Sequence, residues 1–522
     1  MTAHLPVLPV VIPLLLGAAC VLIERKSPRS VGAVSLLSTV LQLGVALMLL
    51  TESFSGHIDV YLLSNWAAPF GIVFAVDRLA TLMLTLTALL GVVVALWSRG
   101  GDDRRGPHFH AFLQFQLMGL NGAFLTGDLF NLFVFFEVLL ASSYALLLHG
   151  AGTAQLRASV HYIVFNLVGG ALFLVAASML YGLTGTLNLA DLMGKLAALG
   201  PADAALARAA AGLLILVFAI KAALLPLYFW LPATYGSATA PVAALFAIMT
   251  KLGVYAILRV STLLFVPGPL DGLVSTALPV LGLATLGLSA IGALAATRLA
   301  SLLGYVVVGS AGTLLVTVGL GDANAIAAGL VYLVNSTLVA AGTFLVLDRV
   351  RRRQDHGDTL DPGRDGAPVA RARGAGLFML FAMGASGLPP LAGFFGKALV
   401  LKASLGGPWA VAVWSVTLTS SLFVLVSLAR AGVYLFWKPE ASVSNDAPPL
   451  GGAETVALTL VAALVVGTSA LAGPITSFAE KTAAQLLDRG HYIGQVLAKR
   501  PVQAAWPIRA ELEERLRSGG EK

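Results

Sequence analysis

Long apolar runs separated by short polar segments dominate the chain. A helix needs about 20 apolar residues to cross a bilayer core of about 30 Å, and runs of that kind centre near residues 14, 41, 84, 117, 138, 170, 218, 251, 285, 311, 336, 388, 422 and 463. The pattern predicts an all-α polytopic membrane protein with about 14 transmembrane helices. The first run lacks the basic segment and cleavage motif of a signal peptide, so we expect it to be retained.

Two of these runs are interrupted in the same way. Span 7 contains Lys221, Pro226 and Pro232, and span 12 reads "SGLPPLAGFFGKALVLKA" and contains Lys397. Proline removes a backbone donor and clashes with the preceding turn, so both helices should be discontinuous. Broken helices at corresponding places in two halves are typical of transporters built from inverted repeats. We therefore expect two inverted five-helix repeats, each with a broken helix.

This organisation divides the chain into five parts. They are residues 1–100 with spans 1–3, residues 109–263 as the first repeat with spans 4–8, residues 272–437 as the second repeat with spans 9–13 and a polar loop at 349–374, residues 453–473 as span 14, and residues 474–522 as a tail. In the tail, apolar residues recur at helical spacing among charges. This pattern predicts an amphipathic helix on the membrane surface or on a partner subunit.

Basic residues in the short loops indicate the topology. The loops after spans 1, 3, 9 and 11 carry Lys or Arg, whereas those after spans 2, 4, 7 and 10 carry none. The positive-inside rule then places the odd-numbered loops in the cytoplasm and the N-terminus outside. Fourteen spans place the C-terminus outside as well. We expect a multi-pass protein of the cell (inner) membrane.

Composition excludes several function classes. Only 11% of the residues are charged, and the net charge of +7 comes from basic residues in loops and in the tail, so we expect no nucleic-acid partner. The single cysteine, Cys20, cannot form an internal disulfide or ligate an iron–sulfur cluster by itself. The sequence has no HExxH, and no GxGxxG or GxxxxGK[ST] follows a plausible strand. We therefore expect no cofactor, no metal site and no nucleotide site.

Four ionisable residues lie inside the predicted spans: Glu137, Lys221, Lys251 and Lys397. Such a residue near the centre of a span costs about 2.5–3.5 kcal/mol on insertion scales and usually serves function. A lysine in apolar surroundings releases its proton more readily, and an approaching carboxylate favours its charged form. Movement of Glu137 relative to Lys221 would thus switch the lysine between holding and passing a proton. The alternative is a structural ion pair, but one Glu leaves at least two lysines unpaired.

Weaker candidates accompany these four. Asp77 precedes Arg78 near the start of span 3, where the two could form a helix-end ion pair. His161 and Asn166 lie about one turn apart in span 6, within plausible reach of Glu137. A lone histidine near a helix end is more often structural than functional.

Three stretches resemble a known family: "GDLFNLFVFFEVLLASSYALL", "KAALLPLYFWLPATYGSATAPVAALFAIMTKLGVYAILR" and "LPPLAGFFGKALVLKA". They are similar to the proton-translocating antiporter-like subunits shared by respiratory complex I, membrane-bound hydrogenases and Mrp-type cation/proton antiporters. Length, span number and the loop "YGLTGTLNLADL" are most similar to the D subunits of Mrp (Mnh or Pha) antiporters. The resemblance extends to about residue 475 and implies the inverted-repeat fold.

The resemblance also implies roles for the buried charges. Glu137 matches the family's span 5 glutamate and Lys221 its span 7 lysine, a pair that modulates proton release. Lys251 matches the connecting lysine of span 8. Lys397 falls where family members carry Lys or Glu in the broken span 12.

Span 11 departs from the family pattern. It has Asn335 and Ser336 around the place where many relatives have a histidine. Neither side chain titrates near neutrality, so water or a hydroxyl would have to bridge Lys251 and Lys397.

Together these features imply an ion-transporter subunit and not an enzyme. The expected function is proton translocation in a multisubunit Na⁺(K⁺)/H⁺ antiporter, with other membrane subunits, protons, monovalent cations and membrane lipid as partners. The first alternative is a proton-pumping subunit of complex I (NADH–quinone oxidoreductase) or of a membrane-bound hydrogenase. The second is a scaffold whose charges only lock helices together.

Overall fold

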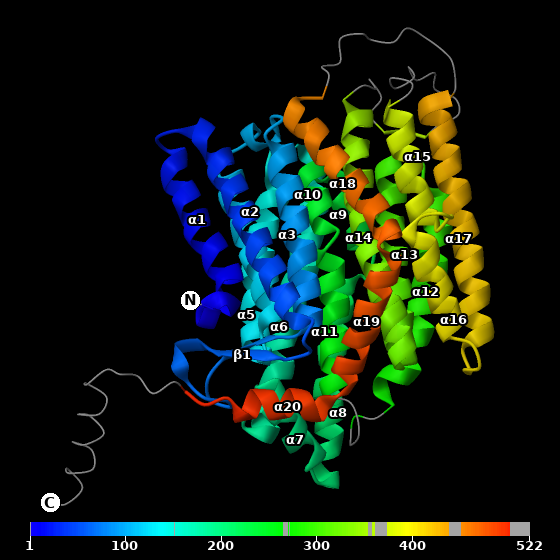
Figure 1. The fold of residues 1–522 in the computed structure, drawn as a ribbon. Helices are drawn as coiled ribbons and strands as arrows, with labels where there is room; N and C mark the ends of the chain where they lie inside the picture. The colour runs from blue at the N-terminus through cyan, green and yellow to red at the C-terminus, as the bar shows by residue number, and fades with distance from the viewer. Residues whose placement is uncertain are drawn as a thin grey trace, which may run out of the picture.

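Helices that run roughly side by side make up almost all of the molecule (Figure 1). The structure is a computed structural model that describes residues 2–150, 152–264, 270, 272–352, 358–360, 373–437 and 450–501. Most of the predicted polar loop at 349–374, and the tail beyond residue 501, lie outside these residues.

The first half of the chain begins with three long helices and a small sheet. The elements are α1 (Leu8–Glu24), α2 (Pro28–Ser53), β1 (Asp59–Leu62), β2 (Val73–Val76) and α3 (Arg78–Ser98). They are followed by α4 (Phe109–Leu125), α5 (Leu129–Leu148), α6 (Thr153–Thr184), α7 (Leu189–Ala197), α8 (Pro201–Ala222), α9 (Trp230–Ser237), α10 (Ala240–Phe246) and α11 (Met249–Leu264).

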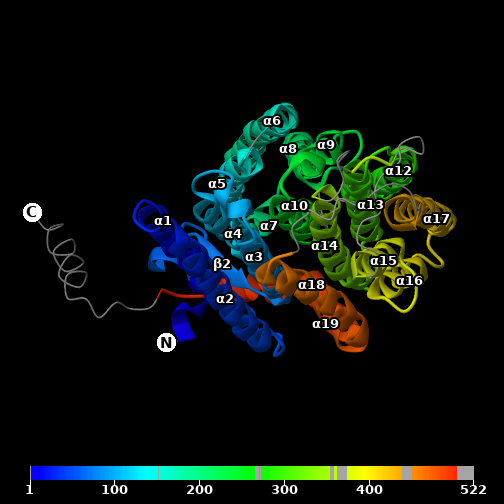
Figure 2. The same cartoon turned by 90° about the horizontal axis from the view of Figure 1, so that it is seen from above.

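The second half contains the remaining helices. These are α12 (Leu273–Ala295), α13 (Leu299–Leu320), α14 (Ala323–Arg351), α15 (Arg373–Ser386), α16 (Ala392–Ala403), α17 (Ala410–Gly432), α18 (Gly452–Ala470), α19 (Ala472–Leu487) and α20 (Arg489–Ala498). Seen from above, α12, α13, α15, α16 and α17 cluster on one side, and α18 and α19 run along one edge (Figure 2).

The predicted spans are present as helices. Among the described residues, 12 helical segments are long and apolar enough to cross a membrane. The other two of the fourteen predicted spans are α4, which has 17 residues, and the broken pair α15–α16. The mostly helical membrane fold is therefore confirmed. The relation of the two halves as inverted repeats stays a prediction.

Both predicted helix breaks occur. α8 is followed by Ala223 in the left-handed region (φ 56°), and α9 begins only at Trp230. α15 is followed by Gly387 at φ 80°, and α16 begins at Ala392. Pro232 lies in the first turn of α9, where a missing backbone N–H leaves no helix bond unmade.

Three features differ from or add to the sequence-based picture. Span 8 consists of two helices, α10 and α11, separated by residues 247 and 248. The loop between α2 and α3 forms a two-stranded antiparallel sheet with Asp59 opposite Val76. The first part of the predicted tail, residues 474–487, belongs to α19 (Ala472–Leu487), which packs against α14 of the same chain. On another side of α19, Gln485 accepts a hydrogen bond from the Arg78 N–H at the start of α3 and donates one to the Gly56 carbonyl in the loop after α2.

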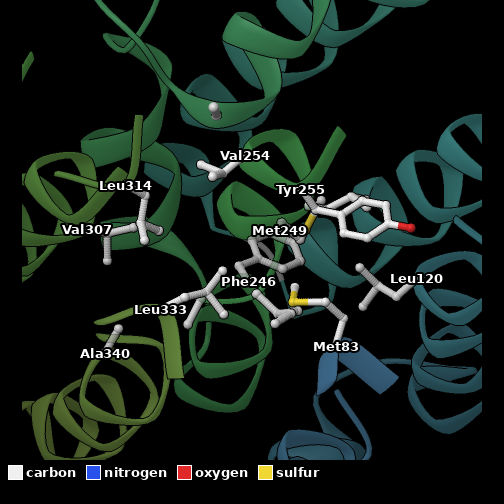
Figure 3. Packing of buried hydrophobic residues seen from close by; sticks show 14 of the residues in the cluster. Met83, Leu120, Phe246, Met249, Val254, Tyr255, Val307, Leu314, Leu333 and Ala340 are labelled. Atoms are coloured by element: carbon white, nitrogen blue, oxygen red, sulfur yellow. The ribbon is translucent and has the colours of Figure 1, made fainter. Parts of the chain in front are cut away.

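The apolar core surrounds α10 and α11. Figure 3 shows Met83 of α3, Phe246 of α10, Met249 of α11 and Leu333 of α14 packed together. The segment from Ala240 to Leu264 is buried over its whole length. A charged residue on α11 therefore lies in the interior of the protein and not at its lipid-facing surface.

Candidate functional site

Lys251 on α11 is a buried lysine that has no carboxylate partner in the part of the chain that the structure describes. None of its surface is exposed, and its Nζ donates to Ser310 Oγ of α13 at 2.7 Å. Thr250 Oγ1 is a weaker acceptor at 3.4 Å. Among the described residues, no ion pair involves Lys251. Burial of an unpaired charge opposes folding, so stability does not account for this lysine.

Lys221 lies in the last turn of α8, directly before the helix break. Its Nζ donates to Asn166 Oδ1 of α6 at 2.9 Å and lies 5.8 Å from the centre of the Phe136 ring. Only 6% of the residue is exposed. The carbonyl end of the helix dipole also favours a cation at this position.

Glu137 of α5 is the nearby acid, but it makes no ion pair with Lys221 among the described residues. Its Oε1 is buried, accepts no hydrogen bond and lies against Gly170 of α6, where a Cβ would clash with it. Asn166 was expected to reach Glu137, and it binds Lys221 instead. In the structure, Lys221 is therefore bound by the neutral amide of Asn166, and the Glu137 carboxylate lies nearby without contacting it.

Lys397 belongs to the second half of the other broken helix. Its Nζ reaches back to α15 and donates to the carbonyl oxygens of Ser386 at 2.8 Å and Ala385 at 3.3 Å. A third acceptor is Ser421 Oγ of α17 at 2.9 Å. The ammonium therefore satisfies carbonyls that the break leaves without helix partners.

A small cavity, mostly apolar but with several polar side chains in its lining, lies between the hydrogen-bond partners of Lys251 and those of Lys397. Its volume is about 20 Å³, and its lining includes Ser310, which accepts from Lys251, and Ala385, whose carbonyl accepts from Lys397. Asn335 and Ser336 of α14 also line it. Asn335 donates to the Gly384 carbonyl, but its Oδ1 is buried without a partner. A cavity of this size holds about one water molecule, and an unpartnered polar atom favours one there.

The two weaker candidates lie elsewhere. His161 is exposed on α6, and its Nδ1 is 3.1 Å from the Arg157 carbonyl oxygen. Asp77 caps α3 by accepting from the Ala80 N–H at 2.8 Å, and it pairs with Arg259 of α11. The expected pair with Arg78 is wrong, because the Arg78 guanidinium donates to backbone carbonyls instead.

Sequence reasoning missed two lysine partners, Ser310 and Ser421. Serine is common in the predicted spans, so no signal in the sequence separates these two from the others. The site offers amines with hydroxyl, amide and carbonyl acceptors. Among the described residues, no group of three or more His, Cys, Asp or Glu side chains could hold a metal ion. The arrangement suits proton transfer along hydrogen bonds.

A family model described as NADH:quinone oxidoreductase/Mrp antiporter, TM matches residues 126–423. The D component of a probable K(+)/H(+) antiporter from Rhizobium meliloti is 39% identical over 518 residues, which cover 93% of this chain and 96% of that protein. The D component of a Na(+)/H(+) antiporter from Alkalihalophilus pseudofirmus is 35% identical, covering 95% of this chain and 99% of that protein.

Among solved structures, a chain of the Mrp complex from Dietzia sp. DQ12-45-1b is similar to the whole fold. The TM-score is 0.84 at 27% sequence identity, and the match covers 95% of this chain and 99% of that chain. Sequence and structure thus agree over nearly the full length.

Proposed function

Because this chain belongs to the NADH:quinone oxidoreductase/Mrp antiporter transmembrane family, we propose that it translocates protons as the D component of a multisubunit cation/proton antiporter. The relatives that cover nearly all of the chain are named as D components of Na(+)/H(+) or K(+)/H(+) antiporters. This favours antiport over the alternative of a pumping subunit in complex I or a hydrogenase. The chain is a multi-pass membrane protein of the cell membrane, and it would act together with other membrane subunits.

Lys251 is the observation that carries the proton-path proposal. A fully buried ammonium with no carboxylate partner among the described residues lowers the stability of the folded protein. A residue whose only role was to hold helices together would not lower stability in this way. A lysine whose acceptors are neutral hydroxyls can lose its proton without leaving a buried carboxylate unpaired. Lys251 therefore suits proton exchange better than it suits a lock between helices.

The path runs from Glu137 and Lys221 through Lys251 to Lys397. Lys221 is held by Asn166, so movement of Glu137 toward Lys221 would favour the charged lysine, and withdrawal would favour release of its proton. The cavity beside Asn335 supplies the link between Lys251 and Lys397. One water there would replace the histidine that many relatives have in this span.

Exchange by the whole complex tests this function. In a host whose own antiporters are deleted, everted vesicles containing the complete complex should exchange Na⁺ or K⁺ for protons, with the pH change read from a fluorescent dye. Vesicles that contain every subunit except this one should show no exchange. Full exchange without this chain would contradict the proposal. Failure of an imposed pH gradient to drive exchange in the absence of an electron donor would contradict antiport and favour the redox-complex alternative.

Replacing Asn335 with leucine tests the water link. Leucine branches at the same carbon but is larger and apolar, so it removes both the donor to Gly384 and the buried, unpartnered oxygen of a residue that lines the cavity. We expect the exchange rate per assembled complex to fall by about 100-fold or more, the range that a positioned proton-transfer group contributes. Asn335→His should keep most of the activity, because imidazole can itself pass a proton.

The matched control for this variant is Thr337→Val. Thr337 is also buried on α14, but its hydroxyl bonds the Leu333 carbonyl of its own helix and it does not line the cavity. This variant should exchange within about twofold of wild type, since the hydroxyl that it removes bonds within its own helix and lies outside the cavity lining. A normal rate for Asn335→Leu in an assembled complex would exclude the water link.

A further inference from the structure

A second, larger cavity opens at one end of the bundle and takes no part in the proposed proton path. Its volume is about 610 Å³, within the range of small-molecule sites. It lies where α6 and α13 begin, and α9 sits between these two helices (Figure 2). The loops at this end of the bundle are those after the odd-numbered spans, which the positive-inside rule places in the cytoplasm. The cavity is therefore predicted to face the cytoplasm.

The cavity is basic. Arg157 of α6, Arg298 before α13 and Arg351 of α14 line it together with His161, and no Asp or Glu is found among its described lining residues. One carboxylate, Asp358, lies behind the lining and contacts Arg298 at 2.7 Å and Arg351 at 3.6 Å. Among the described residues, three guanidinium groups against one carboxylate leave two positive charges in excess. This charge repels Na⁺ and K⁺ and attracts an anion.

Asp358 orients two of the arginines. Its carboxylate accepts from the Ala300 N–H at 2.8 Å and is thereby fixed at the start of α13. Burial acts to raise the pKa of Asp358, but Arg351, Arg298 and this backbone N–H outweigh it, so the pKa lies below its ordinary value. The carboxylate stays charged at neutral pH. Guanidinium groups held in place match the geometry of phosphate oxygens and can bind them in pairs.

An apolar stripe leads away from the cavity along α6. Leu156, Val160, Val164 and Leu167 are 53%, 52%, 53% and 62% exposed. Their spacing of three and four residues places them on one face of the helix. Arg157 and His161 lie beside the start of this stripe and line the cavity. A basic cavity that continues into an exposed apolar helix face has the two chemistries of a phospholipid, a charged headgroup and acyl chains.

We propose that this basic cavity binds the phosphate headgroup of an anionic phospholipid, whose acyl chains lie along the exposed stripe of α6. The arginines provide the phosphate contacts, and Asp358 holds Arg298 and Arg351 at the cavity wall, where Arg351 also donates to the Gly236 carbonyl. The lipid would fill the space between α6 and α9, α13 and α14 at this end of the bundle. Binding here does not depend on the proton path, so it can be measured without any transport assay.

Titration of the purified complex with lipid tests the proposal. Phosphatidylglycerol is added in a neutral detergent, and the lipids bound per complex are counted by native mass spectrometry. The wild-type complex should bind at least one phosphatidylglycerol at this site. In the double variant Arg157→Gln/Arg298→Gln, the affinity for this lipid should be about tenfold or more lower, because each lost charge-assisted hydrogen bond costs more than about 1.4 kcal/mol of binding free energy. Phosphatidylcholine should not occupy this site.

Two variants keep the test decisive. Arg29→Gln removes an exposed arginine of α2 that is predicted to lie on the same side of the membrane as the cavity but does not line it. This variant should bind phosphatidylglycerol as wild type does. If the double variant fails to assemble, the single Arg157→Gln replaces it, because Arg157 is exposed. Equal lipid binding by wild type and the cavity variants would overturn the proposal. Displacement of the lipid by millimolar inorganic phosphate would overturn it too, since the cavity would then be a site for free phosphate.

Discussion

Lys221→Met should abolish cation/proton exchange while the complex still assembles. Methionine has a similar length and stays in the buried position before the helix break, but it cannot bind or release a proton. We expect the exchange rate in everted vesicles to fall by about 100-fold or more, as for loss of a positioned proton-transfer group. Lys221→Arg should be equally inactive, because a guanidinium keeps its proton at any physiological pH.

The arginine variant separates charge from proton exchange. If Lys221 only held helices together through its charge, arginine would preserve activity and methionine would weaken assembly. Lys195→Met is the matched control, because Lys195 is a half-exposed lysine on the short helix α7 that pairs with Asp191. It should exchange at the wild-type rate. Activity in Lys221→Arg would contradict a role in proton release.

Lys251→Met should have opposite effects on transport and stability. Lys251 is fully buried, and among the described residues it is hydrogen-bonded only to hydroxyl groups. The substitution removes an ammonium whose desolvation costs several kcal/mol and keeps an apolar side chain of similar size. We expect exchange to fall by about 100-fold or more, with a melting temperature of the purified complex equal to or above that of wild type.

Thr262→Val is the control for this variant. Thr262 is also a buried polar residue of α11, but its hydroxyl bonds carbonyls of its own helix. The variant should transport normally. A lower melting temperature for Lys251→Met, together with loss of subunits from the complex, would show that the lysine is structural and would support the scaffold alternative.

Much of this fold could be predicted from the sequence because a membrane restricts the possible structures. Apolar runs of about 20 residues must be helices when they cross a bilayer, and all fourteen predicted spans are found as single helices or, for spans 8 and 12, as pairs of helices. The break after Lys221 was predictable from Pro226, since proline cannot continue the hydrogen bonding of α8. Because the spans were predicted correctly, the burial of Lys221 and Lys251 inside the helix bundle was also predictable.

The partners of those lysines could not be predicted. A sequence gives a residue's place along its helix, but not which neighbouring helix faces it. Asn166 therefore was expected near Glu137, whereas it binds Lys221. In the sequence nothing distinguishes Ser310 and Ser421 from other serines. They become partners of Lys251 and Lys397 only through the packing of α13 and α17.

Other misses have similar causes. Residues 474–487 carry an amphipathic pattern, from which we expected a helix on the membrane surface or on a partner subunit, but in the structure they belong to α19 and pack along α14 of the same chain. The pattern shows that one face is buried without showing what buries it. In the same way, Asp77 next to Arg78 suggested a local pair, whereas its partner, Arg259, is far away in the sequence.

The central claim is that protons move along the row of buried lysines. Proton flux per assembled complex, measured with an entrapped pH-sensitive dye in proteoliposomes after a pulse of Na⁺ or K⁺, tests it most directly when wild type is compared with Lys251→Met. The account predicts flux about 100-fold or more below wild type, in a complex with all its subunits and an undiminished melting temperature. Wild-type flux from an assembled Lys251→Met complex would contradict it.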